Sequence, residues 1–259
     1  MLTRILTAII ALVLFIPIIL IGSWPLAIVM TSLAVIGLAE FHKMKKITIT
    51  SVPALLSLIG VALMVLSVYF PVLFAVEVFT RTISLVMILL FLYSIAFTRL
   101  TTQDIGEITL IMTYIGIGFY SFVSLRFSNL PLLILVLLVI WATDTGAYLI
   151  GRKIGKTKLA PNISPNKTIE GSIGGTILAS ALAFVYLFYF PQSDSLFANF
   201  LLVIIISITG QIGDLLESKI KREYHTKDSG KLLPGHGGVL DRFDSLLLVL
   251  NLLFILGIV

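Results

Sequence analysis

The stretch ILTAIIALVLFIPIILIGSWPLAIVMTSLAVIGLA, residues 5–39, contains no charged side chain. Crossing the hydrocarbon core of a bilayer takes about 20 helical residues, and this run is much longer. It breaks at Gly22-Ser23-Trp24-Pro25, so it predicts two membrane-spanning helices rather than one. No small-x-small cleavage site follows the first of them, and we expect that helix to be retained rather than removed as a secretory signal.

The rest of the chain repeats this pattern. Of its 259 residues, 58% are hydrophobic and 12% are charged, and the mean hydropathy of +1.11 excludes an ordinary soluble domain. A second long run, 47–76, breaks at Phe70-Pro71 and supplies one helix and a connection. The runs together predict an all-α, polytopic integral membrane protein with about nine transmembrane helices. The expected spans are 4–21, 25–40, 53–69, 82–98, 107–125, 131–150, 171–190, 196–217 and 243–258.

The distribution of basic residues predicts the orientation. Nine spans place 16 of the 18 Lys and Arg residues in loops on the side of the N-terminus, leaving only Arg81 and Arg126 on the other side. By the positive-inside rule the N-terminus is then cytoplasmic and the C-terminus lies outside. We therefore expect a multi-pass protein of the cell (inner) membrane. The same asymmetry accounts for the pI of about 9.4, so no nucleic-acid partner is expected.

Two polar regions fall on the predicted cytoplasmic face. One is 151–170, and the other is 218–244, which reads SKIKREYHTKDSGKLLPGHGGVLDRFD. The second region concentrates basic residues, carboxylates and a Gly-His-Gly-Gly turn between two apolar runs. Since the chain shows no internal repeat and no appended soluble segment, we expect a single integral membrane domain over 1–259. Within it, 1–130 would be mainly scaffold, and 131–259 would carry a catalytic site facing the cytoplasm.

Four carboxylates lie at the predicted cytoplasmic ends of the sixth, eighth and ninth spans. A charge at the bilayer centre costs roughly 2.5–3.5 kcal/mol on insertion scales, so such residues are usually functional or paired. Pairing with a nearby Lys or Arg, which would merely anchor a helix end, is the plainer interpretation. Carboxylates on adjoining helix ends suit Mg²⁺, which binds one or two carboxylates together with substrate phosphates. The candidate metal ligands are Asp144, Asp214, Asp241 and Asp244.

Basic residues on the same face are candidates for phosphate contacts. A solvated, positive-inside loop explains some of them, but it does not explain why carboxylates and glycines are interleaved with the others. Gly237 and Gly238 would free backbone N–H groups for close approach to an anion. His236, directly before them, is either a turn histidine or a phosphate contact. The basic candidates are Lys167, Lys221, Arg222, Lys227 and Arg242.

Residues 218–244 resemble the signature of the phosphatidate cytidylyltransferases (CDP-diacylglycerol synthases). The matching elements are Ser218, Lys221-Arg222, Lys227-Asp228, Gly230, His236-Gly237-Gly238, Asp241-Arg242 and Asp244. A second block is similar to the same family: Asp144-Thr-Gly-Ala-Tyr148, Gly151-Arg152, Gly155-Lys156, Ser164-Pro-Asn-Lys-Thr168 and Glu170-Gly171. The chain departs from the common family pattern at Asn166 and Ile169, where Lys and Trp are usual. The two blocks cover about a fifth of the chain.

The resemblance implies a reaction in which CTP and phosphatidic acid give CDP-diacylglycerol and pyrophosphate. It also implies a divalent metal, a homodimer and a helical membrane fold, and it leaves a second, monovalent cation open. The catalytic residues it implies are Lys167, Lys221, Arg222, Lys227, Asp228, His236 and Arg242. The substrate-binding residues it implies are Ser164, Asn166, Ser218, Gly237 and Gly238.

Three alternatives remain at this point. A CTP-dependent kinase for an isoprenoid alcohol shares the membrane setting and the nucleotide, but it lacks the long pattern of 218–244. A secondary transporter of an anionic substrate would explain charged residues in the membrane. Against it, the intramembrane carboxylates lie only in the second half, and no inverted repeat is visible. A purely structural membrane scaffold leaves those carboxylates without a cause.

The predicted topology can be tested by labelling. A tag after Val259 should react with a membrane-impermeant reagent added to intact cells, because the C-terminus follows the ninth span. A tag between Lys153 and Lys167 should react only after the membrane is opened. Labelling of both tags from the same side would rule out nine spans.

Overall fold

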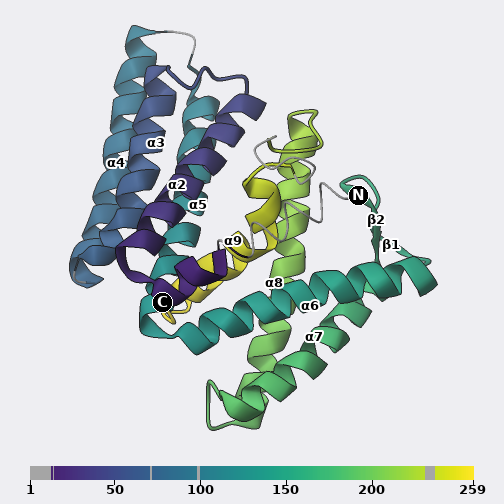
Figure 1. The fold of residues 1–259 in the computed structure, drawn as a ribbon. Coiled ribbons are helices and arrows are strands. Elements are labelled where there is room, and N and C mark those ends of the chain that lie inside the picture. The colour runs from purple at the N-terminus through teal and green to yellow at the C-terminus, as the bar shows by residue number, and fades with distance from the viewer. Residues whose placement is uncertain (1–12, 14, 71, 98–99, 231–236) are drawn as a thin grey trace. The chain divides into compact units, whose positions relative to one another are not determined.

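The computed structural model describes residues 13, 15–70, 72–97, 100–230 and 237–259, and these residues are mainly helical (Figure 1). A two-stranded hairpin between α6 and α7 contains the only strands among them, and the sequence analysis did not predict it. The elements are α2 (Ser23–Met44), α3 (Val52–Leu66), the 3₁₀ turn η1 (Ser67–Tyr69), α4 (Val72–Ala96), α5 (Thr102–Ser128), α6 (Leu130–Ile154), β1 (Lys158–Ala160), β2 (Ser164–Thr168), α7 (Ile169–Tyr189), α8 (Leu196–Glu223) and α9 (Leu240–Ile255).

Seven of the described helices are long and apolar enough to cross a membrane, and they correspond to the second through eighth predicted spans. The prediction of a helical integral membrane protein is thereby confirmed. Most of the first predicted span, 4–21, lies outside the described residues, although 15–21 is helical. The ninth corresponds to α9, which has 16 residues. The count of nine therefore stays a prediction.

Several helices extend beyond the predicted spans, and among the described helices the largest difference is at the start of the fourth span. The fourth span was expected to begin at residue 82, after the charged Arg81, but α4 begins at Val72. Glu77 and Arg81 stay within the helix as a pair four residues apart, with Arg81 Nη2 2.7 Å from Glu77 Oε2. Because an ion pair on one helical face offsets part of the cost of each charge, neither residue ends the helix.

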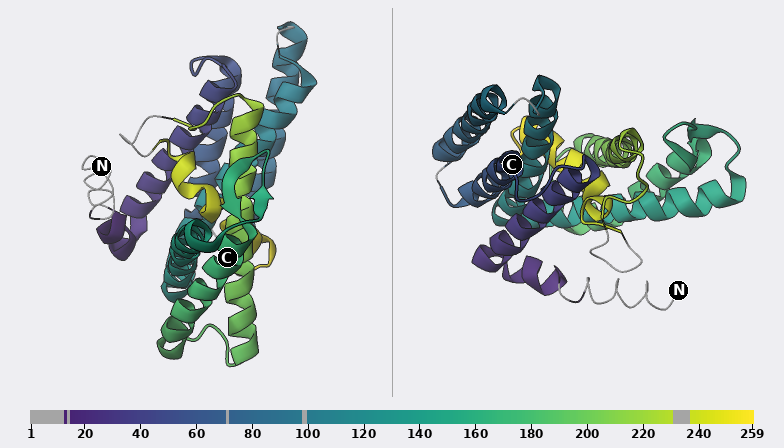
Figure 2. Two further views of the ribbon diagram at one scale, coloured as in Figure 1. Left: turned by 90° about the vertical axis from the view of Figure 1, so that its right-hand side faces the viewer. Right: turned by 90° about the horizontal axis from the view of Figure 1, so that it is seen from above.

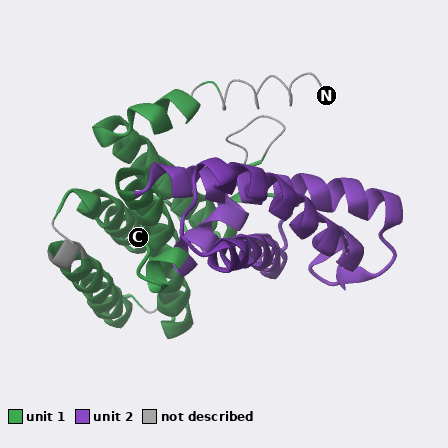
Figure 3. Ribbon diagram, turned by 90° about the horizontal axis from the view of Figure 1, so that it is seen from below, with its two compact units in different colours: residues 1–128, 228–242, 253–259 green, residues 129–227, 243–252 purple. Residues whose placement is uncertain are grey.

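The chain divides into two compact units, coloured separately in Figure 3. Unit 1 comprises 1–128, 228–242 and 253–259, and unit 2 comprises 129–227 and 243–252. In unit 1, helices α2 to α5 lie side by side as a bundle (Figures 1 and 2). Glycines let α3 and α5 approach closely: a Cβ added at Gly116 would stand 2.8 Å from Met64 Sδ, and one at Gly60 would stand 2.7 Å from Met112 Sδ.

In unit 2, α6 and α7 pack backbone against backbone. A Cβ at Gly175 would lie 2.5 Å from the carbonyl oxygen of Thr143, and one at Gly171 would lie 2.7 Å from that of Ala147. Gly146 faces Gly175 in the same way, at 2.9 Å from its Cα. This spacing of small residues is the arrangement by which membrane helices approach most closely. This close contact determines which side of α6 and which side of α7 face the rest of unit 2.

The hairpin β1–β2 connects these two helices. Its strands are antiparallel, with Lys158 opposite Thr168 and Ala160 opposite Ser164, and the register shifts between the two pairs. Thr168 ends β2 and caps α7, since its Oγ1 accepts the N–H of Gly171 at 3.2 Å. The residues of the second sequence block are therefore carried on a short, anchored structure.

Candidate active site

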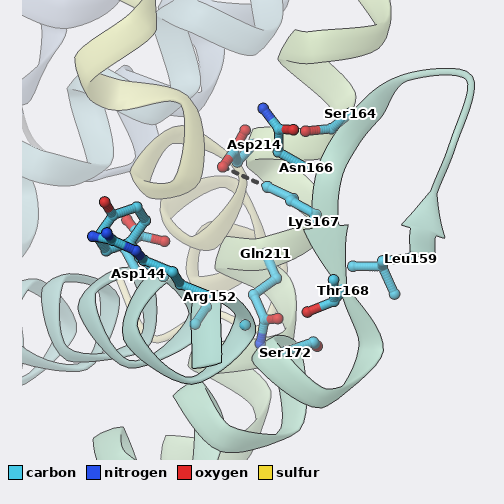
Figure 4. Close-up of a pocket in the computed structure, with 13 residues that line it drawn as sticks. Asp144, Arg152, Leu159, Ser164, Asn166, Lys167, Thr168, Ser172, Gln211 and Asp214 are labelled. Atoms are coloured by element: carbon cyan, nitrogen blue, oxygen red, sulfur yellow. Dashed lines mark ion pairs between the residues drawn. The ribbon is translucent and has the colours of Figure 1, made fainter. Parts of the chain in front are cut away.

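A cavity of about 530 Å³ opens in unit 2 (Figure 4). Its walls come from α6, the hairpin, the start of α7 and one stretch of α8. The cavity is lined by Asp144, Ala147, Tyr148, Gly151, Arg152, Leu159, Ser164, Asn166, Lys167, Thr168, Ser172, Gln211 and Asp214. Both positive and negative side chains thus border one space within helices of a membrane protein.

Helix α6 supplies one side of the cavity through residues four apart. Asp144, Tyr148 and Arg152 occupy positions i, i+4 and i+8, which lie on one helical face. Gly151, on the same side, has no side chain to fill the space, and a Cβ there would stand 2.9 Å from Thr168 Oγ1. Helix α6 therefore presents a carboxylate, an aromatic ring and a guanidinium to the cavity in succession.

Strand β2 supplies the opposite side with Ser164, Asn166 and Lys167. The Lys167 ammonium points from the hairpin to α8, where its Nζ lies 2.5 Å from Asp214 Oδ2 (Figure 4). The other oxygen, Oδ1, accepts the Ser218 hydroxyl at 3.3 Å. Asp214 is thus held by a cation and by a hydroxyl one turn along its own helix.

Three carboxylates act on one another in this unit. Asp144 lies within electrostatic range of Asp244 and Asp214, and Lys167 opposes their negative charge. Close packing of α8 against the second turn of α9 keeps Asp244 near Asp214, because Gly213 allows it: a Cβ there would be 2.6 Å from the carbonyl oxygen of Asp244. Concentrated negative charge of this kind favours binding of a cation.

The carboxylates of this site suit a Mg²⁺ ion that also binds substrate phosphates. They do not form a complete set of protein ligands. Within the described ranges, no group of three or more His, Cys, Asp or Glu side chains stands ready to hold a metal. Mg²⁺ does not require one, because it prefers hard oxygen ligands and usually keeps waters and substrate phosphates beside one or two carboxylates. Asp144 and Asp214 line the cavity with such oxygens, Asp244 interacts electrostatically with both, and no softer ligand stands among the residues that line the cavity.

The remaining basic candidates of unit 2 do not line the cavity. Lys221 is only 8% exposed, and its Nζ is 3.4 Å from Glu217 Oε1 on the same helix. Arg222 donates from Nη1 to the carbonyl oxygen of Thr226 at 3.0 Å, across the turn that follows α8. Lys227 is exposed. In this structure Lys221 and Arg222 therefore organise the end of α8.

In unit 1, the described residues on either side of 231–236 are held by a buried carboxylate that was not among the predicted site residues. Glu40 of α2, 7% exposed, accepts the backbone N–H groups of Val239 at 2.9 Å and Leu240 at 3.1 Å. It also accepts the Ser229 hydroxyl at 3.0 Å. These N–H groups belong to the start of α9, where a helix has no internal acceptors and favours a negative charge.

Asp241, like Glu40, accepts hydrogen bonds from the backbone of this segment. Its Oδ2 accepts the N–H of Ser229 at 2.9 Å and the N–H of Gly238 at 2.8 Å, and it lies 3.0 Å from the Ser229 hydroxyl, whose single proton is shared between Asp241 and Glu40. Gly237 has φ +84°, and a Cβ there would stand 2.5 Å from the same oxygen. At Gly238 a Cβ would collide with the Ser229 hydroxyl and with both carboxylate oxygens of Glu40. These two glycines therefore make room for carboxylates.

The other candidates of this segment are less constrained. Asp228 and Arg242 are exposed. His236 lies outside the described residues, so its expected phosphate contact stays a prediction.

Comparison with known proteins agrees with the chemistry of this site. Residues 2–259 match the Cytidylyltransferase family. The chain belongs to this family. It is 43% identical to the phosphatidate cytidylyltransferase of Staphylococcus haemolyticus (strain JCSC1435), over 98% of this chain and 97% of the relative. It is 38% identical to the phosphatidate cytidylyltransferase of Bacillus subtilis (strain 168), over 98% of this chain and 96% of the relative.

In this cytidylyltransferase, Glu40 and Gln211 have structural roles that the sequence did not predict, and Glu170, quoted above only as part of the second block, has one as well. Glu40 ends the uncharged run 5–39, and its position at the end of an apolar helix was the available signal. Gln211 precedes Asp214 by three residues and so shares its helical face. Glu170 follows the hairpin directly, where a carboxylate can accept N–H groups at the start of α7.

Glu170 holds the base of the hairpin. Its carboxylate accepts the N–H of Lys156 at 3.1 Å and the N–H and hydroxyl of Thr157, at 3.1 and 2.9 Å. Because Lys167 is carried on the same hairpin, loss of these bonds should displace the ammonium from Asp214. We expect Glu170→Ala to lower turnover roughly 10- to 100-fold, measured as CTP-dependent product formation in purified enzyme. Glu223→Ala, an exposed glutamate 4.0 Å from Lys219, is the control and should be nearly silent; equal losses in both variants would contradict this role.

Glu40 should contribute to stability. Replacement by Gln leaves one acceptor and turns an NH₂ group toward backbone donors that need an acceptor. Breaking a buried bond to a charged group costs about 1–3 kcal/mol, so Glu40→Gln should unfold at a lower temperature in detergent than the unmodified protein. Glu77→Gln, on the exposed face of α4, serves as the matched variant. An unchanged melting temperature for Glu40→Gln would show that the bonds to Val239 and Leu240 carry little free energy.

Proposed function

We propose that the chain transfers CMP from CTP to phosphatidic acid, giving CDP-diacylglycerol and pyrophosphate, and that it does so in the cavity of unit 2. The Lys167–Asp214 pair carries the proposal, because it ties the sequence block 144–171 to α8, four residues before the signature 218–244, at a membrane-helix cavity that also contains Asp144 and Arg152. The names of the curated relatives support the choice of substrates.

The reaction needs charge stabilisation more than proton transfer. A phosphate oxygen of phosphatidic acid forms a bond to the α-phosphorus of CTP, while the bond from that phosphorus to the bridging oxygen breaks and pyrophosphate leaves. The attacking monoester is largely dianionic near neutral pH, so it requires no general base. What opposes the reaction is the approach of two anions, and Lys167 and Arg152 would offset that repulsion by binding phosphate oxygens.

Mg²⁺ is the proposed cofactor. Asp144, Asp214 and Asp244 would hold it, and the ion would neutralise charge on the phosphates of CTP and on the departing pyrophosphate. Lys167 would then move from the carboxylate of Asp214 to substrate phosphate. The proposal does not include or exclude binding of a second, monovalent cation.

Further phosphate and substrate contacts are proposed for the remaining members of the two blocks. Asp241 is proposed as a metal ligand, although its Oδ2 already accepts two backbone hydrogen bonds. The other residues of the two blocks are proposed on the basis of the family resemblance and of their charge. They are Ser164, Asn166, Ser218, Lys221, Arg222, Lys227, Asp228, His236, Gly237, Gly238 and Arg242.

The proposed setting is the cell (inner) membrane, with nine spans, a cytoplasmic N-terminus and a homodimer. The basic loops support the cytoplasmic orientation of the cavity mouth. In this orientation CTP arrives from the cytosol, while phosphatidic acid arrives laterally from the bilayer. The decisive assay is Mg²⁺-dependent release of pyrophosphate from CTP that occurs only when phosphatidic acid is present. A CTP-dependent lipid kinase, a transporter or a scaffold would not give that result.

The metal assignment predicts the behaviour of Asp214→Asn. The substitution keeps size and some hydrogen bonding but removes the charge, so turnover should fall about 100-fold or more, and the Mg²⁺ concentration for half-maximal activity should rise. The measurement is a Mg²⁺ titration of the purified enzyme. Asp194→Asn, in the exposed connection before α8, should match the unmodified protein. Near-normal turnover of Asp214→Asn at low Mg²⁺ would refute the assignment.

A further inference from the structure

Behind the cavity, three hydroxyl groups connect α6, α7 and α8 within unit 2. Thr143 Oγ1 lies 2.9 Å from Ser207 Oγ, and Ser207 Oγ lies 2.9 Å from Thr176 Oγ1. Thr176 also donates to the carbonyl oxygen of Ser172 at 3.1 Å. Ser207 is fully buried and Thr143 is 2% exposed. Buried hydroxyls in an apolar helix bundle are costly unless they are hydrogen-bonded, and this chain satisfies them.

The cavity residue Gln211 ends this chain of hydroxyls, with its Nε2 3.0 Å from Thr176 Oγ1. The single proton of the Thr176 hydroxyl is used on the Ser172 carbonyl, so Thr176 can only accept from the amide. In this hydrogen-bond assignment the NH₂ group of the amide faces Thr176, and Oε1 points elsewhere. The network therefore selects one of the two orientations of the side chain.

One N–H of Gln211 remains for a ligand. Among the described residues, the Gln211 side chain makes no hydrogen bond besides the one to Thr176. The side chain borders the cavity between Lys167 and Ser172 (Figure 4). Because Gln211 is half-buried and borders the cavity, this N–H is available to an acceptor on a ligand that enters the cavity.

The position of Gln211 along α8 indicates which ligand group that is. Gln211 precedes Asp214 by three residues, so it lies on the same face, about 4.5 Å along the helix axis. It is displaced toward Leu196, away from the end of α8 that carries the basic residues. In the proposed orientation this is the membrane side of the phosphate-binding groups. A lipid phosphate held at Lys167 has its glycerol ester carbonyls on that side.

We propose that Gln211 is a lipid-recognition residue that donates its second N–H to an ester carbonyl of phosphatidic acid, and that Thr176 positions it. The neutral amide suits a carbonyl, whereas Lys167 and Arg152 in the same cavity suit the phosphates. Recognition of the ester would explain why a membrane enzyme maintains a polar network behind its charged site. This inference rests on the proposed function, because it assumes that phosphatidic acid enters this cavity.

The test compares two substrates in the same protein: phosphatidic acid with ester-linked chains, and its analogue with ether-linked chains, which lacks the carbonyls. A single neutral hydrogen bond is worth about three- to tenfold in kcat/KM, so the unmodified enzyme should prefer the ester by that factor. Gln211→Met should abolish the preference, and Thr176→Val should reduce it. The ratio is independent of how much of each variant folds, so a poorly folding variant still gives an answer.

Matched controls are Gln103→Met and Thr113→Val. The Gln103 amide donates to Glu107, and the Thr113 hydroxyl donates to the Thr109 carbonyl, both within α5; neither variant should change the ratio. The inference is overturned if the unmodified enzyme has no ester preference, if Gln211→Met retains it, or if the loss in Gln211→Met is a raised KM for CTP alone. Absence of any CDP-diacylglycerol from the unmodified enzyme with ester substrate would instead overturn the proposed function.

Discussion

The architecture of the site depends on the backbone contact between α6 and α7. Gly146, Gly171 and Gly175 let the two helices approach until a single added methyl group would collide with a carbonyl oxygen or a Cα. At this separation Thr168 can cap α7 beside Gly151, and the hairpin leaves the helix pair from a fixed point. The position of the cavity therefore depends on the lack of side chains at these three glycines. Its charged side chains extend from a framework that tolerates almost no displacement.

Charge compensation is the second constraint, and it differs between the two units. In unit 2 the carboxylates near the cavity are only partly compensated, since Lys167 faces more than one of them. In unit 1 Glu40 and Asp241 are surrounded by hydrogen-bond donors from the backbone and from Ser229. A carboxylate with satisfied oxygens stabilises structure, whereas one with unsatisfied charge is able to bind a cation or a substrate.

Sequence alone predicted the helical membrane fold, because long apolar runs form membrane-spanning helices, in which every backbone polar group is hydrogen-bonded. It also selected Asp144, Lys167 and Asp214, which the structure places at one cavity. The hairpin was not predicted, since its residues are polar and show no strand alternation. The start of α4 was misplaced because an ion pair within a helix looks, in sequence, like a loop. Glu40 was overlooked because most of its partners are backbone N–H groups, and these cannot be identified from residue types in the sequence.

The bonds of Glu40 have a consequence for biosynthesis. Its acceptors are used by N–H groups 199 and 200 residues later in the chain. At synthesis rates of about 5–20 residues per second, the interval between them is roughly 10–40 s. Throughout that time α2 carries a carboxylate whose backbone donors do not yet exist, so water must hydrate it in their place. The folding of unit 1 around Glu40 therefore cannot be completed until the segment with Val239 and Leu240 has been synthesised.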